Sequence, residues 1–424
     1  MKRSSRSIPL QYLDQYSLAD SKPIYHFLQK HSSGYEFALC IPAYAESSSL
    51  ETIWQNFPLA NTPESASPKN PGLILILLNH PTTATAEALQ KNQQTQSAIL
   101  NLGQSIATES FTSTDIQLNL HLIIPQARQD LHLCLIHSLK PYSPKQGIGK
   151  ARRVLADTAA HLYYNDLLSN PWFGMTDADA RLPAEYIQAL SELKVSNTSA
   201  GLGLFPFQHQ IFSNESQKTQ QLLKLHRLYE AYLEDYRHHL EMAFAEYAHT
   251  PLGSIMAIHC HAYTHVRGFP LKAAGEDFYL MNKMIKMFKV FQICSQPILL
   301  ETRFSERTPF GTGQSVLKLS QETHIHQLPL FYNEEVLQQW ILLLRNIKHA
   351  VSTQEWHEIT HLYPMLLEFP WFNTLIQESQ KAKTPEQKTH ILLHNIDGLR
   401  CQQLLRLLHD GIPRSTAEQR WFTL

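Results

Sequence analysis

The feature that most restricts the fold of this chain is an uninterrupted apolar run at residues 72–78, Gly-Leu-Ile-Leu-Ile-Leu-Leu. A run of this kind, without polar alternation, predicts a strand that is buried on both faces. Residues 36–41 and 131–136 form similar runs, and residues 83–102 have a helical pattern. Such strands, alternating with helices, favour an α/β fold with a mainly parallel sheet flanked by helices. Further apolar strands are predicted at residues 199–205, 253–259 and 289–294.

Another apolar run, at residues 172–175, leads into the aspartates Asp177 and Asp179. A strand that ends in this way places both carboxylates at the carboxyl edge of the sheet, where ligands bind in open α/β folds. Two hard oxygen ligands suit Mg²⁺ or Mn²⁺, because Mg²⁺ is usually held by one or two carboxylates and by substrate phosphates. The alternative interpretation is a solvated acidic turn that caps the next predicted helix, at residues 184–193.

Composition limits the class of protein. The 424 residues are 43% hydrophobic and 17% charged, which predicts one large or two ordinary globular domains. The net charge of −1 provides no general attraction for nucleic acid, so we expect no nucleic-acid partner. No apolar run approaches the roughly 18 residues that a membrane span needs, which leaves room only for peripheral membrane contact.

The five cysteines are far apart and lie mostly within apolar runs. This distribution predicts reduced and buried thiols, and it fits neither a disulfide framework nor a zinc site. The basic amino terminus is not followed by the apolar segment of a secretory signal. We therefore expect a cytoplasmic protein.

A glycine-containing stretch at residues 145–153 leads into a helical pattern, and Lys150, Arg152 and Arg153 lie at the start of this pattern. A glycine-rich turn that opens onto a helix can hold an anion such as a diphosphate. The alternative is a plain loop before a solvated basic helix start. The spacing differs from that of a phosphate-binding Walker A loop.

Two acidic residues, Glu276 and Asp277, lie near the start of a predicted helix at residues 274–287. Acidic side chains at this place also stabilise a helix through its dipole, so their presence alone does not indicate catalysis. His259 and His261 would share one face of a strand. With no third ligand in view, a structural role is favoured for both.

A long helix is predicted at residues 215–249. From about residue 330 the chain has helical patterns only, and shorter helices are predicted at 334–349, 354–367, 385–393 and 397–409. The predicted organisation is an N-terminal arm at 1–35, an α/β domain at 36–315 and a helical C-terminal extension at 330–424. A charged, glycine-rich segment at 301–313 is either a loop whose arginines hold an anionic donor or acceptor, or a connector.

Five segments now occur in a characteristic order. They are residues 41–46 (Ile-Pro-Ala-Tyr-Ala-Glu), 149–153 (Gly-Lys-Ala-Arg-Arg), 176–179 (Thr-Asp-Ala-Asp) followed by Leu182-Pro183, 267–270 (Arg-Gly-Phe-Pro) and 275–278 (Gly-Glu-Asp-Phe). Together they resemble the family 2 glycosyltransferases, inverting enzymes with the GT-A fold that use nucleotide-sugar donors. The resemblance covers residues 36–300 and implies a fold of the nucleotide-diphospho-sugar transferase type.

Several positions depart from the family pattern. Ala45 stands where Asn is common, and Arg267 replaces the first Gly of the turn. Asn79 lies where many members have an Asp that reads the nucleobase, so the identity of the base stays open. The Gln-x-x-Arg-Trp signature of processive polysaccharide synthases is absent after Asp277, so the resemblance implies a non-processive enzyme.

The resemblance implies a role for each motif. Asp177 and Asp179 would hold Mn²⁺ or Mg²⁺ on the donor diphosphate, and Asp277 would be the general base, with Glu276 as the alternative. The donor-binding candidates are Pro42, Ala43, Tyr44, Glu46, Asn79, Lys150, Arg152, Arg153 and, through the ribose or sugar, Asp177. Some enzymes of this fold take a further metal ligand from a late histidine, for which the candidates are His259, His261, His265, His324 and His326.

The resulting hypothesis is a metal-dependent inverting glycosyltransferase. It would move a sugar from a nucleotide-sugar donor to a saccharide, a lipid-linked or another hydroxyl acceptor. A nucleotidyltransferase on a related fold is an alternative, because that chemistry also uses metal-binding carboxylates on an α/β nucleotide fold. A catalytically degenerate protein that binds nucleotide sugars is a third hypothesis.

Overall fold

The computed structural model describes residues 7–46, 70–196, 199–212, 216–304, 312–320, 330–416 and 419. The chain forms two compact units, which we name the α/β unit and the helical unit. The α/β unit comprises Met1–Asn214, Pro251–Met284 and Phe288–Gly311, and the helical unit comprises Glu215–Thr250, Ile285–Met287 and Thr312–Leu424.

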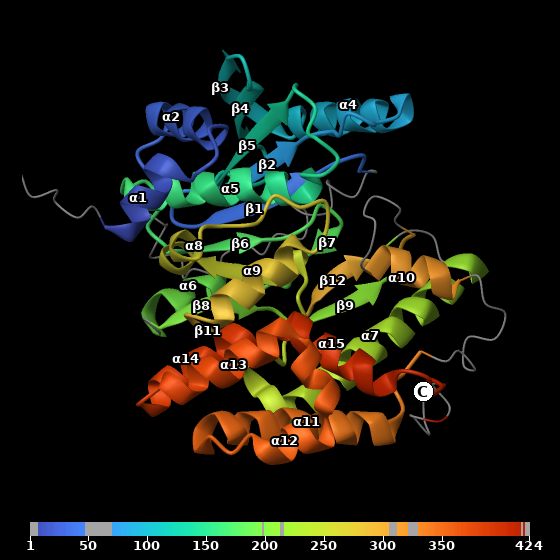
Figure 1. The fold of residues 1–424 in the computed structure, drawn as a ribbon. Helices are drawn as coiled ribbons and strands as arrows, with labels where there is room; N and C mark the ends of the chain where they lie inside the picture. The colour runs from blue at the N-terminus through green and yellow to red at the C-terminus, as the bar shows by residue number, and fades with distance from the viewer. Residues whose placement is uncertain are drawn as a thin grey trace, which may run out of the picture. The chain divides into compact units, whose positions relative to one another are not determined.

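The described part of the α/β unit contains a nine-stranded sheet in the order β11-β8-β10-β6-β1-β2-β5-β4-β3 (Figure 1). Its strands are β1 Ala38–Ala43, β2 Gly72–Leu78, β3 Gly103–Thr112, β4 Gln117–Pro125, β5 Leu131–Ser138, β6 Trp172–Met175, β8 Ala200–Leu204, β10 Met256–His259 and β11 Lys289–Gln292. The central strands β6, β1, β2 and β5 are parallel. On the flanks, β10 is antiparallel to β6 and β8, and β4 is antiparallel to β5 and β3.

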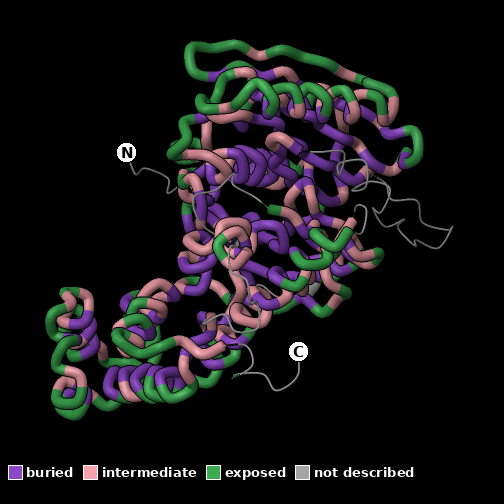
Figure 2. The backbone as a smooth tube through the Cα atoms, turned by 90° about the vertical axis from the view of Figure 1, so that its right-hand side faces the viewer, coloured by how far each residue is buried: buried purple, intermediate pink, exposed green. Residues whose placement is uncertain are grey.

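The expectation of a mainly parallel sheet is therefore right for the centre, whereas the described flanking strands are antiparallel to their neighbours except for the parallel pair β11 and β8. β3, β4 and β5 follow one another through short turns, and short turns join antiparallel neighbours. The buried runs themselves were predicted correctly, since every residue of β1 and β2 is buried. Figure 2 shows buried residues of the chain in purple. The edge strand β3 is mostly exposed or half-buried, and it was not predicted.

Helices cover both faces of the sheet. They are α1 Ile8–Gln15, α2 Ser21–His31, α4 Ala86–Leu100, α5 Gly147–Tyr164, α6 Tyr186–Ser196, α8 Cys260–His265 and α9 Glu276–Ile285, with a short 3-10 helix, η2, at Gly253–Ile255. Successive residues of a strand point to opposite faces. On β6 the ring of Phe173 lies against Tyr263 of α8, whereas a side chain at Gly174 would overlap Tyr186 of α6. The helices α8 and α6 therefore lie on opposite faces, and α5 packs with α8.

A second, small sheet has the order β7-β12-β9, formed by Ala180–Arg181, Ile298–Glu301 and Phe207–Gln210. Next to its ladder, the backbone N–H of Glu301 donates to the carbonyl of Asp179 at 3.1 Å. This sheet brings the segment that follows β6 beside the segment that follows β12.

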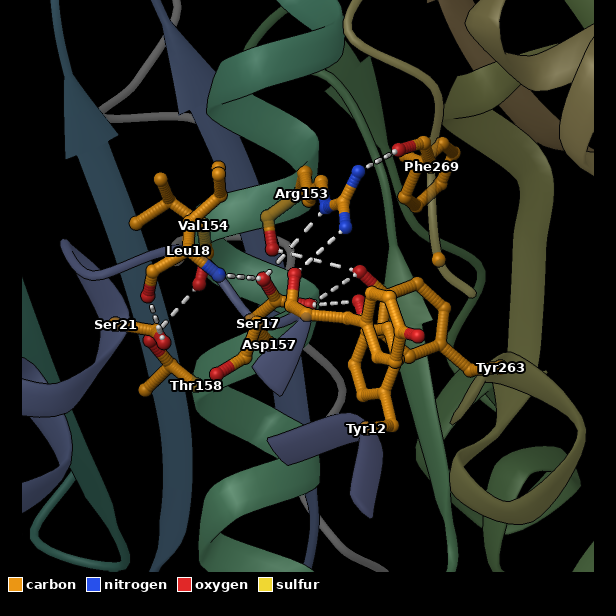
Figure 3. A network of polar contacts seen from close by, with 12 residues as sticks. Tyr12, Ser17, Leu18, Ser21, Arg153, Val154, Asp157, Thr158, Tyr263 and Phe269 are labelled. Carbon is orange, nitrogen blue, oxygen red and sulfur yellow. Dashed lines mark hydrogen bonds and ion pairs between the residues drawn. The ribbon is translucent and has the colours of Figure 1, made fainter. Parts of the chain in front are cut away.

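The described N-terminal residues form two helices, α1 and α2, that pack against α5. Figure 3 shows Tyr12 and Tyr263 converging on Asp157 of α5. Their hydroxyls donate to Asp157 Oδ1 at 2.6 and 2.8 Å, and the N–H of Leu18 donates to Oδ2 at 2.7 Å. Arg153 donates to the carbonyls of Tyr16 and of Phe269. This buried network joins α1, α5 and α8.

The helical unit contains α7 Gln217–Phe244, α10 Thr312–Leu319, α11 Glu334–Thr353, α12 His357–Leu362, α13 Pro370–Lys381, α14 Pro385–Asn395 and α15 Gly398–His409. The long helix α7, which the sequence analysis placed in the α/β domain, packs against α10 and α11. The single helix predicted at 354–367 is instead α12 followed by a 3-10 turn that begins at Pro364, because proline ends a helix. Among the described residues, no helix is both long and apolar enough to span a bilayer.

Candidate functional site

Asp177 and Asp179 lie immediately beyond the carboxyl end of β6, as predicted. The backbone of Thr176 still bonds to Cys40 of β1, and the N–H of Ala180 closes a turn onto the carbonyl of Asp177. The aspartates thus occupy a tight turn between the end of the central sheet and β7. Each carboxylate is paired with an arginine from a distant part of the chain.

The first of these arginines is Arg152, on α5. Its Nη2 donates to Asp177 Oδ1 at 2.6 Å, and its Nη1 pairs with Glu276 Oε1. Arg152 is only 5% exposed, and a Cβ added at Gly253 would overlap its guanidinium carbon. The guanidinium therefore lies directly on the Gly253 backbone. Burial acts to lower the pKa of Arg152, but the carboxylates of Asp177 and Glu276 hold this pKa above its ordinary value.

The two acidic residues at the start of α9 differ in their surroundings. Glu276 is 1% exposed and forms an ion pair with Arg152, while Asp277 is half-buried. Asp277 Oδ2 accepts the N–H of Gly253 at 2.9 Å, and its Oδ1 accepts the N–H of Phe278 at 2.7 Å. Burial raises the pKa of Asp277, and burial raises that of Glu276 to about 7 against the opposing charge of Arg152. Asp277 is therefore the more accessible of the two carboxyl groups.

The second arginine is Arg303, which follows β12. Its Nη2 pairs with Asp179 Oδ2, and its Nη1 lies 3.3 Å from Glu46 Oε2. Burial raises the pKa of Glu46 to about 8, with Arg303 opposing the shift and the aspartates Asp179 and Asp177 adding to it. The loop after β1, the turn after β6 and the segment after β12 therefore meet at one group of charges. From the sequence, Arg303 could be suspected only as one of the arginines of the segment 301–313.

The donor-binding candidates near β1 and β2 lie in β1 itself or in the backbone segments that directly follow the two strands. Pro42 and Ala43 are buried residues of β1, and Tyr44 is half-buried. The N–H of Asn79 donates to the carbonyl of Ala43 at 3.2 Å. The sequence analysis missed Asn92 of α4, whose side chain accepts the N–H of Ala45 and donates to the carbonyl of Asn79. Asn92 ties together the chain segments that follow β1 and β2.

The three cations of α5 have separate partners. Lys150 pairs with Asp20 at 3.3 Å, and Arg153 belongs to the network in Figure 3. Of the three, Arg152 is the one that the structure joins to Asp177 and Glu276. In the glycine turn, the N–H of Gly149 donates to the carbonyl of Lys272 at 3.0 Å, so this backbone donor is used within the chain.

Of the candidate histidines, His259, His261 and His265 lie in the described part of the chain. His259 caps α8, and its Nδ1 accepts the N–H of His261 at 3.1 Å. His261 therefore lies on a helix, and the expectation that both share a strand face was wrong. The described part of the chain contains no group of three or more metal-ligating side chains, and His324 and His326 lie outside it.

The chemistry of the turn after β6 fits a hard divalent cation. Asp177 and Asp179 offer carboxylate oxygens, and each already faces the positive charge of an arginine. Two carboxylates are too few to enclose Mg²⁺ or Mn²⁺ fully, but they match the common arrangement in which substrate phosphates supply further oxygens. A metal held in this way would depend on a phosphate-bearing ligand.

No family model and no curated protein matches the chain. Among solved structures, the chain is similar to the mannosyltransferase PcManGT from Pyrobaculum calidifontis in complex with GDP-Man and Mn²⁺. The two are 13% identical, and the comparison covers 92% of this chain and 98% of the other with a TM-score of 0.34. A likeness at this level carries no argument about the activity of the chain.

Proposed function

We propose that the α/β unit is a non-processive, metal-dependent glycosyltransferase of GT-A type, which inverts the anomeric centre of a nucleotide-sugar donor. The observation that carries the proposal is the junction at Arg152. This residue joins Asp177, at the carboxyl end of β6, to Glu276, beside Asp277 at the start of α9. A candidate leaving-group site and a candidate base therefore share one buried cation.

The proposed reaction is a single displacement. An acceptor hydroxyl oxygen attacks the anomeric carbon while the bond from that carbon to the diphosphate oxygen breaks. The hydroxyl proton passes to Asp277, and the nucleoside diphosphate leaves with the bonding electrons. Asp277 suits the role of base because it is half-buried, is oriented by two backbone N–H groups and has a raised pKa.

The cofactor in this proposal is Mn²⁺ or Mg²⁺, held by Asp177 and Asp179. When bound, it supplies positive charge to the departing diphosphate. Glu46, Pro42, Ala43, Tyr44 and Asn79 remain the candidates for the nucleoside side. The acceptor is a saccharide, a lipid-linked or another hydroxyl compound.

All five cysteines are free and four are buried, which supports the proposed cytoplasmic location.

The test is a panel of nucleotide sugars with the full chain in Mn²⁺ or Mg²⁺, with release of nucleoside diphosphate as the readout. We expect Asp277→Asn and Asp179→Asn each to lower turnover by about 100-fold or more, because each removes a charge that the displacement needs. Asp130→Asn is the control, since Asp130 pairs with Arg128 at the other end of the sheet. Full activity in both site variants would overturn the proposal.

Other outcomes would identify the alternatives. Release of pyrophosphate from a nucleoside triphosphate, with no transfer from any nucleotide sugar, would identify a nucleotidyltransferase. Metal-dependent binding of a nucleotide sugar without turnover would indicate a degenerate binding protein.

A further inference from the structure

We propose, resting on the function above, that Arg303 is a displaceable internal cation that competes with the divalent metal for Asp179 and moves to the diphosphate when a donor binds. Arg303 thereby makes metal binding depend on the diphosphate-bearing ligand.

The first step is the geometry of the pair. Arg303 reaches two carboxylates from different parts of the chain, Asp179 and Glu46. The Asp179 side chain is 16% exposed and that of Glu46 is 4% exposed, so both carboxylates have limited access to water. The guanidinium therefore engages Asp179 Oδ2, one of the two carboxylate oxygens that this residue could offer to a metal ion.

The second step is the contrast between the two arginines. Arg152 is buried against the Gly253 backbone and is held by two carboxylates. The Arg303 side chain is 26% exposed. The backbone before it is fixed, because the N–H of Thr302 donates to the carbonyl of Gln210 at 2.9 Å. Arg303 can thus change partners by rotating its side chain, while Arg152 cannot leave without disturbing the core.

The third step is the balance of charge. A divalent cation and a guanidinium repel each other, so an additional anion favours the presence of both at Asp179. A diphosphate supplies that anion, and guanidinium groups bind phosphate oxygens through paired, charge-assisted hydrogen bonds. Metal and diphosphate should therefore each raise the affinity of the other by the same factor, as linkage requires. Arg303 carries part of this coupling.

The experiment uses the full chain and two probes, Mn²⁺ alone and inorganic pyrophosphate with Mn²⁺ in excess. Mn²⁺ binding is followed by the electron paramagnetic resonance signal of the free ion, and pyrophosphate binding by calorimetry. We expect Arg303→Met to bind Mn²⁺ alone at least about tenfold more tightly than the wild type, since Asp179 is released. The same variant should bind pyrophosphate at least about tenfold more weakly.

Two further variants sharpen the test. Arg303→Lys keeps the charge and should lie between the wild type and Arg303→Met for both probes. Arg181→Met removes a nearby arginine whose guanidinium lies 3.8 Å from the ring centroid of Phe212, and it should bind both probes as the wild type does. If Arg303→Met weakens or does not change Mn²⁺ binding, or if no variant binds Mn²⁺, the inference is wrong.

These opposed changes, tighter Mn²⁺ binding and weaker pyrophosphate binding, distinguish this role from a structural one. A distorted site would bind both probes more weakly. The opposed changes also separate the inference from the proposed reaction. Opposed changes in a chain that transfers no sugar would preserve the role of Arg303 and remove the proposed function. Sugar transfer without opposed changes would support the proposed function and rule out this role of Arg303.

Discussion

Two residues that depart from the glycosyltransferase pattern adopt the same unusual backbone conformation. Ala45 has φ 51° and Arg267 has φ 59°, both in the left-handed region. The pattern has Asn and Gly at these positions, which are the residues that enter this region most easily. Arg267 is partly compensated, because its guanidinium lies 4.6 Å from the ring centroid of Tyr16. Ala45 has no comparable side chain.

We therefore predict that Ala45→Gly stabilises the protein. Relief of the left-handed strain, about 1–2 kcal/mol, exceeds the entropy that glycine adds to the unfolded chain, about 0.4–1 kcal/mol. The free energy of unfolding, measured with urea, should rise by about 0.5–1 kcal/mol. The matched control is Ala43→Gly in β1, which should lower it by a similar amount. Equal destabilisation by both changes would contradict the explanation.

At the residue scale, the chemistry of the site could be predicted better than its contacts. Asp177, Asp179, Glu276 and Asp277 stand out because carboxylates after a strand or at a helix start follow general rules. The pairing of Arg303 with Glu46 could not be foreseen, because 257 residues separate them. Local patterns contain no information about such a contact.

At the scale of elements, the polar network that holds α1, α5 and α8 together depends on one buried carboxyl group. Burial raises the pKa of Asp157 from 3.8 to about 6, although Tyr12, Leu18 and Arg153 favour the ionised form. The unfolded chain therefore loses this proton at a lower pH than the folded protein. Stability from this group is fully present below about pH 4, and it is lost as the pH rises to about 6.

The prediction compares the wild type with Asp157→Asn, which cannot ionise. The free energy of unfolding of the wild type, relative to the variant, should fall by about 2.4 kcal/mol between pH 4 and pH 7. Urea unfolding at four pH values measures it. His161, whose pKa burial lowers to about 4, is present in both proteins, so its own titration cancels. A difference that does not change with pH would contradict the assignment.

The elements themselves were predictable where one periodicity dominates. β1 and β2 are continuously apolar, so the sequence identified both as buried strands. The hairpin of β3 and β4 was missed, because its apolar residues alternate with polar ones and its outer strand is largely exposed. α13 was missed as well. It begins with Pro370 at its first position, where proline is tolerated, directly after a 3-10 turn.

At the scale of the whole molecule, the boundary between the units does not follow chain order. α7 precedes the last strands of the sheet, yet its apolar residues join those of the C-terminal region. Leu228 clusters with Phe331, and Tyr236 stacks on Trp340 of α11. The sequence predicted a long helix at residues 215–249, but not which later helix its apolar residues would contact.

A chain that ends at residue 329 should therefore fold poorly. It would keep α7 but lose α11, and the side chains of Leu228 and Tyr236 would face water. We expect less soluble protein and higher fluorescence of a hydrophobic dye than for a chain that ends at residue 416, which keeps α11 to α15. Equal solubility and equal dye binding of the two chains would show that α7 does not need these helices.

The contact between Arg152 and Gly253 has an evolutionary consequence. A side chain at residue 253 displaces the guanidinium, and a shorter residue at 152 leaves Glu276 without its cation. Neither position can change first without loss, so the two should covary among any descendants of this sequence. Glycine at 253 together with arginine at 152 is therefore a more selective mark of this site than its aspartates, which occur in many unrelated acidic turns.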